Sequence, residues 1–156
     1  MPLLARKSIL AIAAVTDIAV HAGTRAVTAR ALASRYGLPA RHLEPVLQAL
    51  VRHGILKGIR GPRGGYELAR ERSRIFADHI LLAAANTDDE AISPAHSQLL
   101  DEVVMPVLSH AERAFSTALA RISVEDLTRS AQSLRKASKA MEHTGSSEEK
   151  SMRGSA

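Results

Sequence analysis

The stretch 61–65, Gly-Pro-Arg-Gly-Gly, lies beside Arg60 and contains Arg63, and these two arginines are the chain's most distinctive chemistry. Short strands are predicted on both sides, at 55–60 and 66–69, which makes the stretch the tip of a hairpin. Glycine allows a tight turn and a close approach of the backbone to a ligand. Guanidinium groups suit phosphates or a narrow minor groove. A merely solvated tip is the alternative, but two arginines in a glycine-rich turn favour contact with a nucleic-acid backbone.

A second group of polar residues lies just upstream, on one face of a predicted helix that runs from Pro39 to about His53. Its apolar residues recur at helical spacing and should point into a core: Leu43, Val46, Leu47 and Leu50. The opposite face is polar and carries Arg41, Glu44, Pro45, Gln48 and Arg52. This face is therefore the one available for binding.

A shorter helix is predicted before it, at 29–36. Thr28 is suited to cap this helix, and Gly37 to end it in a left-handed conformation. Two helices around a three-residue turn, the second with a polar and basic outer face, are typical of a helix-turn-helix. The hairpin that follows would be a wing beside the second helix.

The rest of the chain is predicted to be helical around these elements. A first helix should run from Lys7 to His21 and a fourth from Phe76 to Ala85, followed by an acidic loop at 86–96. A long amphipathic helix is expected from about Ser97 to Ile122. Its apolar stripe is longer than a small domain needs, so we expect it to form a dimer through Leu100, Val104, Val107, Leu108, Ala111, Phe115 and Leu119.

The last helix is expected to begin at a capping box made by Ser123 and Asp126 and to continue towards Ala140. Residues 142–156 have the composition of a disordered tail. The expected domains are thus a winged helix-turn-helix at 1–85, the loop at 86–96, dimerisation helices at 97–141 and the tail. The fold class is mainly α, with a small two-stranded β wing and a long C-terminal dimerisation helix.

Composition and charge agree with this arrangement. Residues 1–76 carry 13 Lys and Arg against 4 Asp and Glu, a net +9, so the N-terminal half is the candidate polyanion binder. Asp17 interrupts the first apolar run, which argues against a secretory signal and for an amphipathic helix. No other stretch is long enough to span a membrane, so we expect a cytoplasmic protein.

These residues resemble the winged helix-turn-helix regulators that include the iron–sulfur cluster regulator IscR and the nitric-oxide-sensitive repressor NsrR. The resemblance rests on Arg-Gly-Pro-x-Gly-Gly-Tyr-x-Leu at 60–68, His-Leu-Glu at 42–44 and Ile-Ser-Val-Glu-Asp-Leu at 122–127, and covers roughly residues 1–130 in order. It implies a dimer on a palindromic operator. It also implies that Glu44, Arg41 and His42 read base edges and that Arg60 with Gly61 contacts a groove.

Together, the pattern and the resemblance predict a DNA-binding surface of nine residues: Thr28, Arg41, His42, Glu44, Gln48, Arg60, Gly61, Arg63 and Gly64. Pro45 stands where a glutamine is usual in the family pattern, and it removes one backbone donor from the helix. The partner is double-stranded DNA. We expect a transcription regulator, most simply a repressor, and not an enzyme, since no catalytic triad, phosphate loop or metal-ligand cluster stands out.

The chain departs from the cluster-binding members because it contains no cysteine, whereas those members place three between the fourth and the long helix. A cysteine-ligated cluster is therefore not expected, and no cofactor is predicted. Histidines such as His96 and His110 are poorly spaced from acidic residues for a metal site. The alternatives left open are a winged-helix module that binds a protein, and a regulator that senses a partner protein or a small molecule between the fourth and the long helix.

Overall fold

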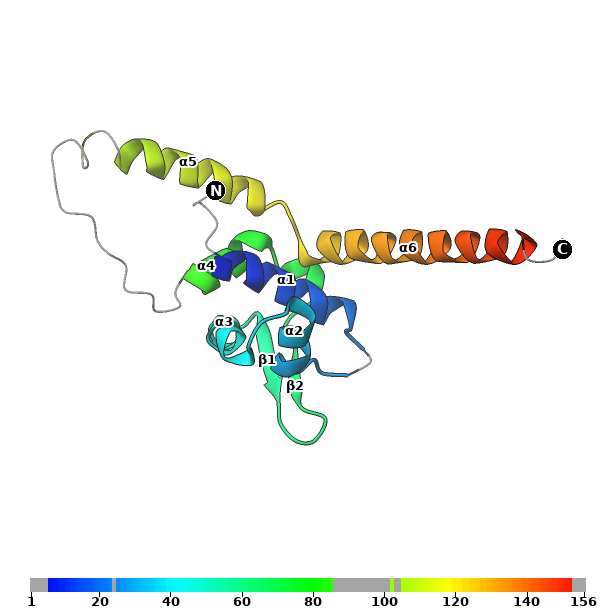
Figure 1. Cartoon of the computed structure of the whole chain (residues 1–156). Helices are drawn as coiled ribbons and strands as arrows, with labels where there is room; N and C mark the ends of the chain where they lie inside the picture. Colours follow the sequence, from blue (N-terminus) through cyan, green and yellow to red (C-terminus); the bar gives the residue numbers. More distant parts are fainter. Residues whose placement is uncertain (1–5, 24, 86–101, 103–104, 153–156) are drawn as a thin grey trace.

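The computed structural model describes residues 6–23, 25–85, 102 and 105–152. Helices predominate, and one antiparallel hairpin projects from one end of the molecule (Figure 1). This is the mainly helical winged fold that the sequence predicts. The elements in chain order are α1 (Arg6–Val20), α2 (Ala29–Tyr36), α3 (Ala40–Arg52), β1 (Leu56–Ile59), β2 (Gly65–Leu68), the 3-10 turn η1 (Arg72–Arg74), α4 (Ala77–Ala85), α5 (Met105–Leu119) and α6 (Val124–Met152).

Helix α1 lies at the centre of the core, where it contacts α3, α4, β2 and α6. Its buried face includes Ala11, Ala14 and Val15, and small side chains of this kind let neighbouring helices approach closely. The four apolar residues predicted to face the core from α3 are fully buried: Leu43, Val46, Leu47 and Leu50. Burial of such side chains contributes about 1.5–3 kcal/mol each, so α3 is held firmly from its inner side.

Local signals set both ends of α2 as predicted. The backbone N–H of Ala31 donates to Thr28 Oγ1 at 3.1 Å, which satisfies one of the unpaired donors at the start of the helix. Gly37 ends the helix with φ 63°, and its N–H and that of Leu38 donate to carbonyls of the last turn. Since α3 begins at Ala40, the turn between the two helices is short and rigid.

The wing is a two-stranded antiparallel sheet with Leu56 opposite Leu68 and Ile59 opposite Gly65. Strand β1 is two residues shorter than the predicted segment 55–60, and β2 has the four residues predicted at 66–69 but begins and ends one residue earlier. Val27 pairs with Tyr66 on the other side of β2 in an isolated antiparallel bridge, a contact that the sequence did not indicate. The hairpin is therefore attached to the chain just before α2.

Helix α5 ends at Leu119, three residues before the predicted end at Ile122. The physical reason is a competing set of backbone bonds: Ala77 N–H donates to the Ile122 carbonyl at 2.9 Å, and Val124 N–H donates to the Ile75 carbonyl at 2.8 Å. These bonds hold 122–124 extended beside the entry to α4. The predicted start of this helix near Ser97, and the acidic loop at 86–96, lie outside the described residues.

The capping box at the start of α6 is confirmed. Asp126 N–H donates to Ser123 Oγ at 3.2 Å, and Ser123 N–H donates to Asp126 Oδ2 at 3.1 Å. Val124 and Thr128 are buried in the first turns, and α6 packs on α1 and η1. The beginning of α6 thus shares the core of the winged domain, although the sequence grouped 97–141 as dimerisation helices.

The far end of α6 differs from the sequence expectation, since the helix continues to Met152 where the composition predicted a disordered tail from 142. Elongation of a helix adds one hydrogen bond per residue once a capped and buried first turn exists, and Glu and Lys in this segment favour it. Figure 1 shows α6 leading away from the core. No helix among the residues with assigned structure has the length and apolarity that crossing a bilayer requires.

Candidate nucleic-acid interface

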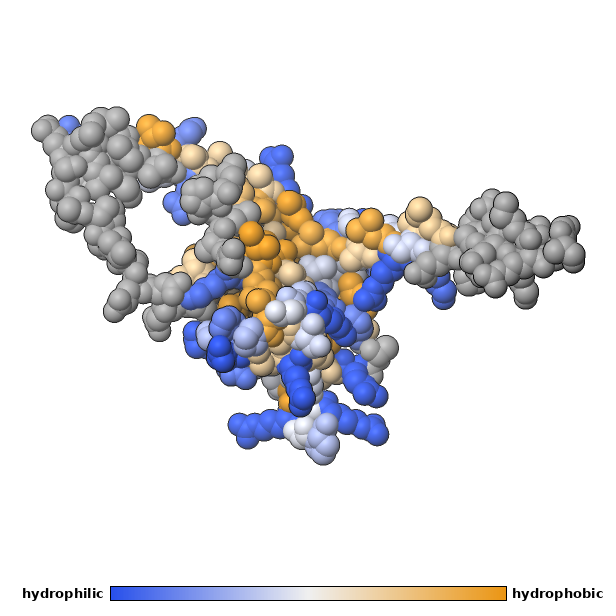
Figure 2. All heavy atoms as spheres, in the orientation of Figure 1, coloured by the Kyte–Doolittle hydropathy of each residue, from blue (hydrophilic) through white to orange (hydrophobic). Residues whose placement is uncertain are grey.

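The start of α2, the helix α3 and the hairpin lie together at one end of the molecule, whereas α5 and α6 lie at the other (Figure 1). Hydrophilic side chains dominate the surface at the hairpin end in Figure 2. All nine residues predicted to bind DNA belong to these three elements or to the residues that join them. The fold therefore gathers into one region residues that are spread from 28 to 64 in the sequence.

The outer face of α3 is exposed along its length. Arg41, His42, Glu44 and Gln48 all reach solvent, while the other side of the helix is buried. Neither Arg41 nor Glu44 forms an ion pair with any residue that the structure describes. Both groups are therefore free to contact a ligand. Pro45 lies inside the helix, so the Arg41 carbonyl lacks its usual intrahelical donor.

The hairpin tip presents Arg60, Gly61 and Arg63 to solvent, and Gly64 is half-buried. Gly61 has φ 103°, and its carbonyl accepts from Gly64 N–H at 2.9 Å to close the turn. A Cβ at Gly64 would lie 2.4 Å from the Ile59 carbonyl oxygen, so glycine is required for this tight closure. Arg60 and Arg63 make no ion pair with the described part of the chain, which leaves their guanidinium groups available for phosphates.

Thr28 is exposed, and its hydroxyl oxygen already accepts from Ala31 N–H as the cap of α2. Its hydroxyl proton is still available to donate, which suits a phosphate oxygen at a helix start. Arg25 and Arg30 flank this point and are also exposed. The sequence analysis did not select them; the excess of positive charge in residues 1–76 was the signal that could have found them.

Two side chains join α3 to the hairpin. Gln48 Nε2 on α3 donates to the Tyr66 hydroxyl oxygen on β2 at 3.3 Å. The backbone of Tyr66 also pairs with Val27 on one side and with Gly58 on the other. Tyr66 was not among the predicted site residues, because its spacing along the chain carries no sign of these distant contacts.

A polar cluster fixes α2 on α1. Arg35 donates to Asp17 Oδ1 at 2.5 Å, and the Tyr36 hydroxyl donates to Asp17 Oδ2 at 3.4 Å. Burial of Tyr36 and the negative charge of Asp17 both raise the pKa of the tyrosine above its ordinary value. The helix-turn-helix is thus held to the core by charge-assisted hydrogen bonds as well as by apolar contacts.

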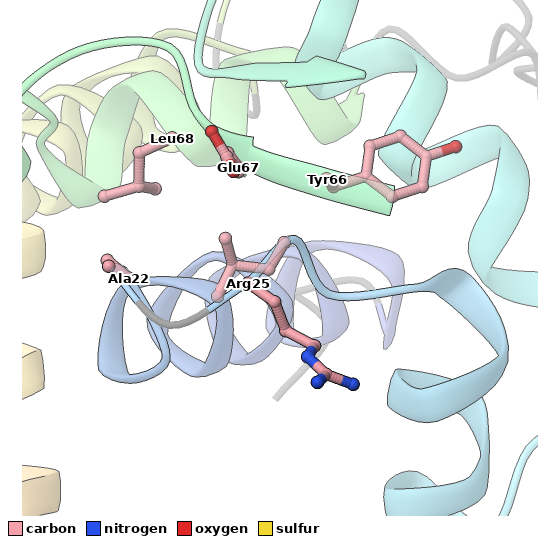
Figure 3. A pocket seen from close by; sticks show the side chains of 7 residues that line it. Ala22, Arg25, Tyr66, Glu67 and Leu68 are labelled. Atoms are coloured by element: carbon pink, nitrogen blue, oxygen red, sulfur yellow. The ribbon is translucent and has the colours of Figure 1, made fainter. Parts of the chain in front are cut away.

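The surface hollow shown in Figure 3, of about 260 Å³, lies between the end of α1 and β2. Ile18 and Leu68 contribute apolar lining, and Arg25 and Glu67 contribute charge. In the close-up the guanidinium of Arg25 points away from β2. Lys57 Nζ lies 3.5 Å from Glu67 Oε2. The charged groups therefore do not converge on one ligand position.

The stripe predicted to form a dimer lies partly on the described part of α5. Val107 is 65% exposed, Ala111 is exposed, and Phe115 and Leu119 are half-buried. Leu100, Val104 and the side chain of Leu108 lie outside the described residues. Ile9 on α1 and Leu82 on α4 are also exposed, at 54% and 62%. Figure 2 shows apolar surface above the hairpin end of the molecule.

A family profile described as that of the Rrf2 iron-dependent transcriptional regulators matches residues 4–130, most of the chain. The chain belongs to the Rrf2 family. Its match confirms the IscR-like regulator that the wing motif predicted, and with it a DNA-binding transcription regulator. The structure of this Rrf2 protein has the winged helix-turn-helix fold described above.

Relatives of this Rrf2 protein are named as HTH-type transcriptional regulators. A Synechocystis protein named as an HTH-type transcriptional regulator is 32% identical over 126 residues, covering 80% of this chain and 86% of the relative. IscR of Xenorhabdus nematophila is 30% identical over 95 residues, covering 61% of this chain and 56% of IscR. These relatives are named as regulators of transcription.

Solved structures support the same fold. IscR of T. potens matches with a TM-score of 0.65 at 26% identity, covering 82% of this chain and 87% of that protein. CymR, the global cysteine regulator of B. subtilis, matches with a TM-score of 0.63 at 21% identity, covering 81% and 95%. The identity to CymR is low, so that match shows the shared fold alone.

The family is described as iron-dependent, so the residues of this chain that could bind iron bear on its function. Thiolates are the usual protein ligands of iron–sulfur clusters, and this Rrf2 protein has no cysteine. Within the described ranges, no three His, Asp or Glu side chains gather in a group that could hold a metal ion. The donor set does not fit a cysteine-ligated cluster.

Proposed function

We propose that this Rrf2 protein binds a palindromic operator as a homodimer and represses transcription without an iron–sulfur cluster. The observation that carries the proposal is the joint exposure of the polar face of α3 and the wing arginines at one end of the fold. Arg41, Arg60 and Arg63 have no acidic partner among the residues described. Unpaired cations on this scale favour a polyanion over a protein surface, whose binding sites are more often apolar or aromatic at the centre.

Helix α3 is proposed to enter the major groove. Glu44 can accept a hydrogen bond from the amino group of cytosine, which is the interaction that gives a carboxylate a role on a basic surface. Arg41 and His42 lie one helical turn or less away and can donate to neighbouring bases or phosphates. Gln48 lies one turn further along and can form a bidentate pair with adenine.

The wing and the start of α2 are proposed to contact the DNA backbone on either side of α3. Arg60, with the close backbone approach that Gly61 allows, is suited to a narrow minor groove. Arg63 and Gly64 at the tip, and Thr28 at the cap of α2, are suited to phosphates. Such contacts fix the position of the protein, while α3 supplies sequence discrimination.

The dimer is proposed to form through α5. An exposed Val107, with Ala111, Phe115 and Leu119 along the same helix, is the described part of an apolar stripe that burial against a second copy would stabilise. Two copies place two α3 helices about one turn of DNA apart, which combines their binding energies on a palindrome. Leu100, Val104 and Leu108 are proposed to extend the stripe.

The signal is proposed to reach this protein without cysteine-bound iron, through a small effector or a partner protein in the cytoplasm. No enzymatic activity is proposed. Anaerobic reconstitution with iron and sulfide should leave the purified protein colourless and its DNA affinity unchanged. A stable chromophore with altered binding would contradict the absence of a cluster.

The test of the function is a mobility-shift titration on the DNA upstream of the protein's own coding sequence, with a scrambled duplex of equal composition as control. A retarded complex on the upstream duplex at concentrations that leave the scrambled duplex free is the expected result. Repeating the titration with cell extract tests for a diffusible signal. Equal binding to both duplexes would contradict sequence-specific regulation.

A further inference from the structure

Tyr66 contacts each of the three elements that form the proposed DNA-binding surface. Its backbone N–H donates to the Val27 carbonyl at 2.8 Å and its carbonyl accepts from Val27 N–H at 3.0 Å, directly before the cap of α2. It lies opposite Gly58 in the hairpin. Its hydroxyl oxygen accepts from Gln48 Nε2 of α3 at 3.3 Å. The backbone contacts hold the strand in place, and the half-buried Tyr66 ring packs against the core, so the hydroxyl is held beside α3.

The bond from Gln48 to Tyr66 restricts the side-chain amide of Gln48. A glutamine amide presents one acceptor and two donors, and rotation by half a turn exchanges the acceptor with the donors. The Tyr66 hydroxyl anchors the end of the Gln48 side chain through Nε2, which leaves Oε1 and the second N–H for a ligand. An acceptor and a donor side by side match the N6 amino group and the N7 atom of adenine in the major groove.

We propose that Tyr66 is a positioning residue that gives Gln48 its base specificity, by holding the Gln48 amide at the place from which it reads adenine. This inference rests on the proposed function, because it requires Gln48 to face a base. Without the hydroxyl, the Gln48 side chain loses this anchor and samples other rotamers. The base pair below Gln48 is then read less strictly, while contacts to phosphates remain.

The chain offers a closely matched set of variants. Tyr66→Phe keeps the ring and the backbone pairing and removes the hydroxyl alone. Tyr36→Phe removes the other tyrosine hydroxyl of the chain, whose bond goes to Asp17 on α1 and not to α3. Gln48→Ala removes the side chain through which Tyr66 is proposed to act. The double variant Tyr66→Phe with Gln48→Ala completes the cycle.

The probes are a consensus duplex, selected by the parent protein from a random pool, and duplexes that change it one base pair at a time. The affinity of each variant is measured by fluorescence anisotropy at one salt concentration, and thermal melting follows stability. Gln48→Ala identifies the base pair that Gln48 reads. At that pair, Tyr66→Phe is expected to lower discrimination by about threefold to tenfold, as the loss of one hydrogen bond would do.

Three further results are expected: Tyr36→Phe keeps the parent's discrimination, Tyr66→Phe keeps it at the other base pairs, and Tyr66→Phe adds no loss in the Gln48→Ala background. The inference is overturned if Tyr66→Phe keeps full discrimination, loses it at every position alike, or loses it equally when Gln48 is absent. A parent protein that selects no consensus would instead contradict the proposed function itself, and the inference with it.

Discussion

Val27 and Tyr66 exchange two backbone hydrogen bonds, at 3.0 and 2.8 Å, across a gap of 39 positions in the sequence. Val27 directly precedes the cap of α2, and Tyr66 lies in the second strand of the wing. The pair therefore joins the helix-turn-helix to the hairpin. Because the two parts are joined at this point, the proposed function has the wing arginines and the outer face of α3 approach DNA as one surface.

Replacing Gly65 by alanine should damage this junction. Gly65 has φ 149°, and a Cβ there would lie 2.7 Å from both the carbonyl carbon and the carbonyl oxygen of Val27. We expect Gly65→Ala to lower the free energy of unfolding by about 1–3 kcal/mol and to weaken operator binding. Chemical denaturation followed by circular dichroism measures the first effect.

Gly58→Ala is the matched control, since Gly58 lies in the same hairpin and nothing comes within 4 Å of a Cβ placed there. This variant should unfold like the parent. If the two alanine variants were equally stable, the wing would not depend on its close approach to Val27.

Replacing Arg60 by alanine should weaken operator binding by about 1–3 kcal/mol if the side chain enters a groove. The slope of log affinity against log salt should also fall, because fewer counterions are released. Arg72→Ala is the control with an equal change of charge, placed in η1, which packs against α6. Similar losses from both variants would show that net charge alone, and not the wing, determines the affinity.

Aspartate at Val107 or Phe115 should separate the dimer. Burial of an unpaired carboxylate in an apolar interface costs several kcal/mol, so the subunits are expected to dissociate instead. Analytical ultracentrifugation should show a monomer, and the operator complex should vanish at concentrations where the parent binds. Ser116→Asp is the control, because Ser116 is exposed on another side of α5. A Val107→Asp variant that stays dimeric would rule out α5 as the interface.

The cap of α6 should make stability depend on acid pH. Hydrogen bonds from the side chain and backbone of Ser123 lower the pKa of Asp126. A lowered pKa in the folded state adds stability above the pKa of the unfolded chain, and this contribution is lost as pH falls through the folded value.

Between about pH 7 and about pH 3, the melting temperature of the parent should therefore fall further than that of either Asp126→Asn or Ser123→Ala. Asn cannot ionise, and Ala at 123 removes the hydroxyl donor. Identical acid profiles for all three proteins would show that the capping box contributes nothing to this dependence.

Local signals predicted the elements that depend on neighbouring residues. Thr28, Gly37 and the Ser123–Asp126 box each act within a few positions, so their types alone indicated where helices begin and end. The buried face of α3 followed from the spacing of its leucines and Val46. The exposed polar face followed in turn, since a helix packed on one side leaves the other to solvent.

Contacts between distant segments could not be predicted in the same way. The bond from Gln48 to Tyr66 depends on how the hairpin packs beside α3. The end of α5 at Leu119 depends on the pairing of Ile122 with Ala77, which lies far back in the chain. The packing of the start of α6 on α1 and η1 likewise joins segments far apart in the sequence, and composition alone gave no sign of it.

The central claim is that α3 and the wing together recognise a DNA sequence. It is tested most directly by the ratio of dissociation constants for a scrambled duplex and for a consensus duplex of equal length, both measured by fluorescence anisotropy at the same near-physiological salt. The account predicts a ratio of about a thousand or more for the parent protein. Specific binding would separate the two binding free energies by several kcal/mol. Dissociation constants within about threefold of each other would contradict the claim.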